Sequence, residues 1–215
     1  MPNHLRVATA AGFAVAVLCL AYAAILAIGL VTLPAPDQPI QNPWFSAMEV
    51  LILGIAPAMV TLTVGLYANA AAERKSFAML SVLFVSMCAV VTCCIHFTVL
   101  ALSRHPAFVG TSWAPLVFSF KWPSVAYALD ILAWDLFFAL SAMFAALAVQ
   151  GSGIASLVRY LLFGSSAFAF IGLAGVPLAS MSIRNIGIIG YAVIFPVAAL
   201  LLALMFIRQG RQGAI

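Results

Sequence analysis

The amino-acid sequence predicts an all-α integral membrane protein: a six-transmembrane-helix bundle built as a single domain over residues 1–215. Two observations support this fold class. Of the 215 residues, 66% are hydrophobic and only 7% are charged, whereas an ordinary soluble domain carries about 25% charged residues. The apolar runs also repeatedly reach the roughly 20 residues that a helix needs to cross the hydrocarbon core. The gaps between these runs are too short to hold a soluble domain.

Six apolar runs mark the predicted helices. The first run follows a short basic start and exceeds the roughly 7–15 apolar residues of a signal peptide. We therefore expect it to remain as the first helix rather than to be cleaved. In the fifth and sixth runs, glycines such as Gly164, Gly172 and Gly187 permit close helix approach. The predicted spans are about 7–33, 46–70, 76–102, 123–149, 156–177 and 185–207.

The connections differ between the two predicted faces of the membrane. Residues 71–75 and 150–155 form short connections, whereas residues 103–122 form a longer one that is rich in aromatic side chains. Tryptophan favours the membrane interface because its ring is apolar and its N–H group requires a polar partner. We therefore predict an aromatic interfacial segment between helices 3 and 4. The alternative is a lid or entrance for a lipophilic ligand, to which Trp113 would contribute.

Lysine and arginine indicate the orientation, because they are retained mainly on the cytoplasmic side. An arrangement with the N-terminus inside places three cations outside, namely Arg104, Lys121 and Arg184. The other six fall inside, namely Arg6, Arg74, Lys75, Arg159, Arg208 and Arg211. The bias predicts a multi-pass protein of the cell membrane, a bacterial inner membrane in the simplest case, with both termini cytoplasmic (N-in/C-in).

The fourth predicted helix carries two aspartates, Asp130 and Asp135. At ~1.5 Å per residue they lie roughly 10 and 18 Å below the helix start, the second close to the bilayer midplane. One aspartate at that depth costs about 2.5–3.5 kcal/mol, which makes each a candidate functional residue. A spacing of five rotates them by roughly 140° on a regular helix, so we expect them to face different partners. Asp130 shares a face with Tyr127 and Trp134.

Each aspartate also has a structural interpretation. It would pair with a cation or a donor such as Arg184, Arg104, Lys121 or His96. Without such a partner, a buried carboxyl group is expected to be protonated at neutral pH.

Glu49 and His96 are the other ionisable residues within the predicted spans. Glu49 lies about one turn into the second helix, shallow enough to reach interfacial water. In the third helix, the spacing of five polar residues places them on one face, which is either the wall of a pocket or a seam of interhelical hydrogen bonds. This polar stripe consists of Ser81, Cys88, Thr92, His96 and Ser103.

The residue inventory excludes several functional classes. His96 is the only histidine within a span, whereas a membrane b-type haem generally takes two. There is no lysine deep in a helix for retinal, and no Glu-x-x-His pair for a di-iron site. The four cysteines lie inside apolar runs and lack zinc-finger spacing. We therefore predict no cofactor, no metal site and, without a basic cluster, no binding of nucleic acid.

The ionisable residues, whose insertion into a bilayer costs free energy, lie in the outer half of the predicted bundle, and Asp135 is the deepest of them. We therefore expect an outward-facing acidic pocket, open from one side, whose partners are the lipid bilayer and a lipophilic small molecule. Acid–base chemistry of an isomerase or cyclase type would use Asp130, Asp135, His96 and Glu49. Ligand-binding candidates are Tyr127, Trp134, Thr92, Arg184 and Trp113. The alternatives are a proton-coupled small-solute transporter that uses Asp135, and a structural or assembly subunit.

Overall fold

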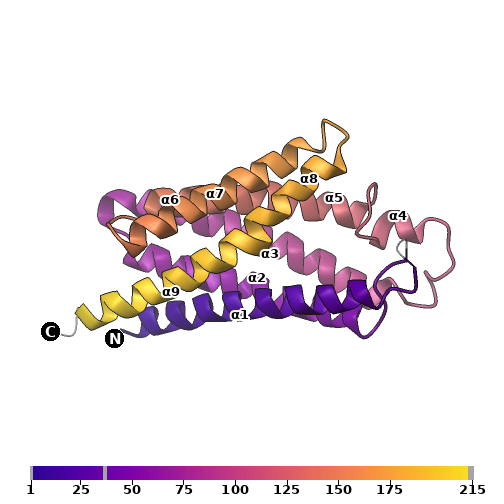
Figure 1. The fold of residues 1–215 in the computed structure, drawn as a ribbon, viewed down its shortest axis with the longest axis horizontal. Coiled ribbons are helices and arrows are strands. Elements are labelled where there is room, and N and C mark those ends of the chain that lie inside the picture. The colour runs from indigo at the N-terminus through magenta and orange to yellow at the C-terminus, as the bar shows by residue number, and fades with distance from the viewer. Residues whose placement is uncertain (1, 36–37, 213–215) are drawn as a thin grey trace.

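The computed structural model describes residues 2–35 and 38–212, and its regular elements within these ranges are all helical (Figure 1). The turn η1 is a 3₁₀-helix, whereas η2 and η3 are π-helical segments. In chain order the elements are α1 (Asn3–Val31), α2 (Trp44–Asn69), η1 (Ala72–Arg74), α3 (Lys75–Leu102), α4 (Ala114–Phe118), α5 (Val125–Ile131), η2 (Leu132–Phe138), α6 (Ala139–Ala148), α7 (Ile154–Ala174), α8 (Met181–Ile188), η3 (Ile189–Ile194) and α9 (Phe195–Gln212).

Six of the helices are long and apolar enough to cross a membrane, as the sequence predicted. Two of them contain a π-helical segment: α5, η2 and α6 form one span, and α8, η3 and α9 form another. The observed bounds agree with the predicted spans to within a few residues at most ends. The largest difference that affects the site is at the sixth span, which begins at Met181 rather than at residue 185. Arg184 therefore lies inside this helix and not in the connection before it.

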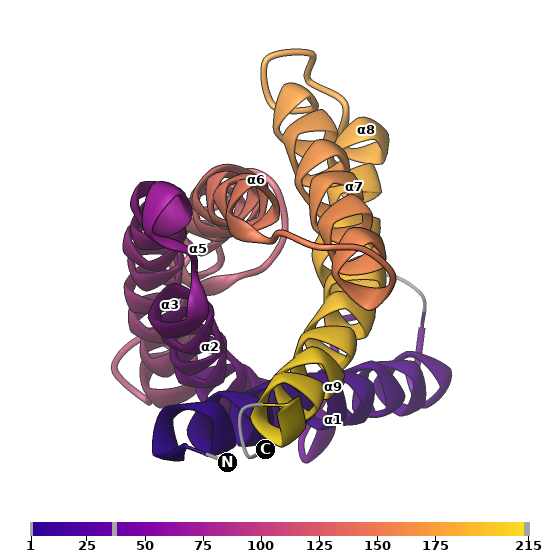
Figure 2. The ribbon, with the colours of Figure 1, turned by 90° about the vertical axis from the view of Figure 1, so that its left-hand side faces the viewer.

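The spans form a ring in which each one packs against the next along the chain (Figure 2). The sixth span closes the ring, because α9 packs along α1. Both termini lie at the same end of the bundle (Figure 1), which follows from an even number of spans. We call this the terminal end, and the opposite end, which carries the connections after α1, α3 and α7, the far end.

The outward faces of the bundle are apolar. Large side chains such as Leu20, Val31, Val90 and Tyr160 are exposed on the helix surfaces. A soluble monomer rarely exposes apolar patches of such extent, but a surface in contact with lipid requires them. The interior is filled mainly by small and branched apolar side chains.

The π-helical segments η2 and η3 are both supported by α7. A π-helix bonds i to i+5 instead of i to i+4, so the change of pattern leaves backbone carbonyls to be satisfied by other groups. Ser166 donates a hydrogen bond to the carbonyl of Ala139 over 2.8 Å, and Ser165 donates one to the carbonyl of Gly190, also over 2.8 Å. Both serines are buried. Two adjacent residues of α7 therefore stabilise the irregular backbone of two neighbouring spans.

Glycines allow α7 and α8 to approach closely, as the sequence indicated for Gly172 and Gly187. A Cβ atom on Gly172 would lie 2.7 Å from the Cα atom of Gly187. A Cβ atom on Gly187 would lie 2.6 Å from Oδ1 of Asp135. Gly164 differs from these positions, because a Cβ atom there meets nothing within 4 Å. The packing role predicted for Gly164 is therefore wrong.

We expect Gly187→Ala to lower the free energy of unfolding by about 1–3 kcal/mol, the usual cost of overpacking. The added methyl group would press on Asp135 and on the backbone of Gly172. Gly164→Ala is the matched control, because it adds the same methyl group into open space. Thermal unfolding of both variants in detergent measures the difference. An equal change in both variants would contradict the close approach of α7 and α8.

Candidate functional site

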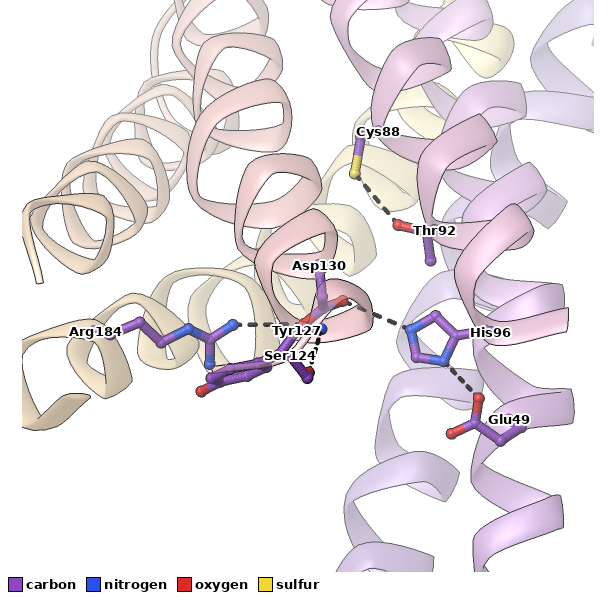
Figure 3. A network of polar contacts seen from close by, with 8 residues as sticks. All are labelled: Glu49, Cys88, Thr92, His96, Ser124, Tyr127, Asp130 and Arg184. Atoms are coloured by element: carbon purple, nitrogen blue, oxygen red, sulfur yellow. Dashed lines mark hydrogen bonds and ion pairs between the residues drawn. The ribbon is translucent and has the colours of Figure 1, made fainter. Parts of the chain in front are cut away.

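Five ionisable side chains from four of the six spans form a continuous line of contacts in the half of the bundle nearer the far end. Figure 3 shows the part of this line from Glu49 to Arg184. Acids and bases alternate along this line. We call it the charged network; its members, in spatial order, are Glu49, His96, Asp130, Arg184 and Asp135. All four residues for which the sequence predicted acid–base roles therefore lie in one network, together with the predicted ligand residue Arg184.

Glu49 and His96 form the shortest contact in the charged network. Oε2 of Glu49 on α2 lies 2.8 Å from Nδ1 of His96 on α3. Glu49 is buried, so it does not occupy the solvated position that the sequence left open. A carboxylate that accepts a hydrogen bond from one ring nitrogen fixes the tautomer and the orientation of the imidazole. The other nitrogen, Nε2, is thereby directed towards Oδ1 of Asp130, at 3.6 Å.

Asp130 and Asp135 face the same cation, Arg184. Nη2 of Arg184 lies 3.5 Å from Oδ2 of Asp130, and its Nε lies 3.4 Å from Oδ2 of Asp135. The expectation that the two aspartates face different partners is therefore wrong. It assumed a regular α-helix, whereas Asp135 lies in the π-helical segment η2. In a π-helix, residues five apart are neighbours along one face.

Arg184 is buried between α8, α5 and η2, although it is a cation. Ser180 caps the start of α8 by accepting a hydrogen bond from the backbone N–H of Ile183, so Arg184 projects from the first full turn. Its guanidinium lies over the ring of Tyr127, 4.6 Å from the centroid. The N-cap of α5, Ser124, fixes the backbone of Tyr127 through a hydrogen bond of 3.1 Å. A cation–π contact of this kind adds about 0.5–2 kcal/mol, depending on how far the cation is desolvated.

The bonding of the charged network is incomplete at its deepest point. Neither carboxylate oxygen of Asp135 has a hydrogen-bond partner among the described residues, and Nε of Arg184 has none either. Three carboxylates oppose one guanidinium and one imidazole. When all three acids are ionised, one negative charge therefore remains unbalanced even if His96 is protonated. An unbalanced charge in an apolar interior is costly.

The members of the charged network differ in how far they can be reached from outside. The side chain of Asp130 is 14% exposed, whereas those of His96 and Arg184 are 7% and 4% exposed and that of Asp135 is 0% exposed. Asp130 is therefore the member that an approaching molecule meets first.

Four members of the polar stripe lie on a buried face of α3, as the spacing predicted, whereas Ser103 lies just past the end of the helix and is only partly buried. The buried part of the stripe has two roles. Near the far end, His96 belongs to the charged network. Towards the terminal end, Ser81 bonds across to Ser141 of α6, whose hydroxyl donates to the backbone carbonyl of Ser81 over 2.9 Å. Between them, Thr92 lies 3.9 Å from the Cys88 sulfur on its own helix. Thr92 is thus buried next to the network without an ion pair or hydrogen bond to it.

The two tryptophans proposed as ligand residues lie in different surroundings. Trp134 is buried and packs against Tyr191 of η3, with ring centroids 5.1 Å apart and the ring planes tilted by 41°. Trp113 is 45% exposed and packs on Phe108 and Phe118 in the connection that contains α4. Trp134, the neighbour of Asp135 in the sequence, therefore belongs to the apolar core, whereas Trp113 belongs to an aromatic cluster at the far end.

Two aromatic residues next to the charged network were not among the sequence-predicted site residues. Phe120 stacks on the ring of His96, with centroids 4.8 Å apart. Tyr191 contacts Trp134 and Phe138. Tyr191 could have been found, because it lies seven residues after Arg184 and hence on the same helix face. Phe120 could not, because its position depends on the path of an irregular connection.

The described residues contain no group of three or more His, Cys, Asp or Glu side chains that could hold a metal ion. The arrangement can instead hold and transfer a proton, because a histidine lies between two carboxylates with one ring nitrogen directed at each. A comparison with protein-family models, one with curated proteins and one with solved structures each found no match.

Proposed function

We propose that this protein binds a lipophilic small molecule at the charged network, in the outer half of a multi-pass protein of the cell membrane whose termini are cytoplasmic. In this proposal the far end is the outer face. One observation carries it: a line of buried ionisable groups with a single partly exposed member, Asp130. A membrane protein that needed only stability would gain little from five such groups, because charged groups within a bilayer are costly.

The site also suits acid–base chemistry on the bound molecule, of an isomerase or cyclase type. Glu49 would orient His96, and Nε2 of His96 would exchange a proton with Asp130 or with a substrate beside it. Arg184 would hold Asp130 in place and stabilise negative charge. Tyr127 and Trp134 would provide aromatic surfaces for a lipophilic substrate. Asp135 would act through Arg184, because it is fully buried.

Binding of eight-carbon amphiphiles tests this proposal. Octanol, octylammonium and octanoate are titrated into the protein in phosphatidylcholine nanodiscs, with the unfolding temperature as the measurement and empty nanodiscs as the correction for partitioning. We expect at least one probe to stabilise the wild type and to lose about tenfold or more in apparent affinity in Asp130→Asn, as loss of a charged hydrogen bond predicts. Glu73→Gln, which alters an exposed acid in η1 at the terminal end, is the control.

Equal binding of every probe to the wild type and to Asp130→Asn would overturn the proposal. If Asp130→Asn and Asp135→Asn then lowered only the unfolding temperature, the charged network would hold the helices together, as in a structural or assembly subunit.

A proton-coupled small-solute transporter is the second candidate function. Its supporting observation is a cavity in the terminal-end half, about the size of one water molecule, whose lining includes Thr63, Ser141 and Phe138. A carrier must be accessible from both sides of its site. Cysteines placed at Thr63 and Ser141, in a variant without the native cysteines, would then react with a membrane-impermeant maleimide from the terminal end. Protection of both positions under all conditions would exclude this candidate.

A further inference from the structure

With its three acids ionised, the charged network has one positive charge too few. Glu49, Asp130 and Asp135 supply three carboxylates, whereas Arg184 and a protonated His96 supply two cations. Each cation already lies between two of the acids. The site therefore carries excess negative charge, which a positively charged ligand would neutralise.

A second, independent observation locates the unsatisfied polar groups. Asp135 is fully buried, yet neither of its carboxylate oxygens has a hydrogen-bond partner in the part of the protein that the structure describes. Its contact with Arg184 is an ion pair of 3.4 Å without a hydrogen bond. Arg184 is thus shared by two carboxylates and fully satisfies neither, since its contact with Asp130 is 3.5 Å long. A cation that bound Asp130 would leave Arg184 free to bond Asp135.

We propose that the ligand of the charged network is a lipophilic amine, which binds as its ammonium ion with the nitrogen against the carboxylate of Asp130. This inference rests on the proposed function and names its class of ligand. An ammonium group offers three hydrogen-bond donors and no acceptor, which complements a site rich in carboxylate oxygens. The apolar part of the ligand would lie along the exposed side chain of Leu129, which is next to Asp130 on α5.

The negative charge of the site disfavours two other classes of lipophilic ligand, carboxylates and neutral alcohols. A carboxylate ligand would add a fourth negative charge beside Asp130, which like-charge repulsion disfavours. A neutral alcohol would leave the negative charge of the network unbalanced in an apolar environment. A bound proton is the other means of neutralising the network, and in that case a neutral ligand would bind as well as a cationic one.

The experiment compares octylammonium, octanol and octanoate by the same nanodisc titration. Neutral phosphatidylcholine is essential, because anionic lipids would concentrate the amine at the surface. We expect wild type and Glu73→Gln to bind octylammonium about tenfold or more tightly than octanol, the preference that one charged hydrogen bond supplies. Octanoate should bind more weakly than octanol. In Asp130→Asn the preference for the amine should fall to about one, whereas Asp130→Glu should retain it because the charge remains.

The outcomes separate the two proposals. If octanol or octanoate bound as tightly as octylammonium, and this binding still depended on Asp130, the proposal that the ligand is an amine would be wrong. The proposed binding site would still stand. If no probe binds in a manner that depends on Asp130, the proposed function fails together with this inference. Retention of the amine preference in a folded Asp130→Asn variant would also overturn the inference, because the preference would then arise elsewhere.

Discussion

Replacing Arg184 with methionine is expected to lower the free energy of unfolding by about 3–5 kcal/mol, the usual cost of removing one partner of a buried ion pair. The loss leaves the fully buried Asp135 without its cation and removes one of the two bases that contact Asp130. It also removes the cation over the ring of Tyr127. Equilibrium unfolding in mixed detergent micelles measures this change.

Arg104→Met is the matched control for Arg184→Met. Arg104 is an exposed arginine at the far end that also lies over an aromatic ring, that of Phe45. We expect this substitution to change stability by less than about 0.5 kcal/mol, as for most surface positions. Adding Asp135→Asn to Arg184→Met should restore part of the lost stability, because one stranded charge is removed. Equal effects of Arg184→Met and Arg104→Met would show that Arg184 does not hold the two acids.

Glu49→Gln is expected to lower the free energy of unfolding by about 1.5–3 kcal/mol, the range for a hydrogen bond that involves a charged group. The amide keeps the shape of the side chain but removes the charge that faces Nδ1 of His96 at 2.8 Å. A double-mutant cycle with His96→Gln isolates the pair. Because Glu49 and His96 are in direct contact, we expect the double variant to be more stable than the sum of the two single losses predicts.

Glu73→Gln serves as the control for Glu49→Gln, since Glu73 is exposed and its loss should be close to neutral. Strict additivity of Glu49→Gln and His96→Gln would mean that the contact between them contributes no net stability. The claim that Glu49 orients the ring of His96 would then no longer be supported.

The fold was predictable because the membrane imposes strong constraints on sequence. A span requires a long apolar run, and these runs located all six helices to within a few residues at most ends. The exception that affects the site, the start of the sixth span, arises because polar residues such as Ser182 and Arg184 resemble a connection. They are tolerated inside the helix because Arg184 finds two carboxylates in the interior of the bundle.

The candidate site was predictable in its members but not in its connections. The cost of ionisable groups in a bilayer selects Glu49, His96, Asp130 and Asp135 directly from the sequence. Their pairing depends on helix packing across the ring, which no local pattern contains. Asp130 and Asp135 can both contact Arg184 because the helix between them is partly π-helical. Nothing in the apolar residues around Asp135 distinguishes a π-helix from an α-helix.

The π-helical segment η2 has a consequence for how related sequences should be compared. A π turn accommodates one residue more than an α turn. Asp130 lies at the end of α5 and Asp135 in η2, so the wider winding between them brings these residues, five apart, into the relation that residues four apart have in an α-helix. A relative with a regular fourth span would then keep both carboxylates on one face with two or three residues between them instead of four. The distance between the two aspartates along the sequence and the type of helix should therefore vary together. An alignment gap of one residue between them would mark conservation of the site rather than its loss.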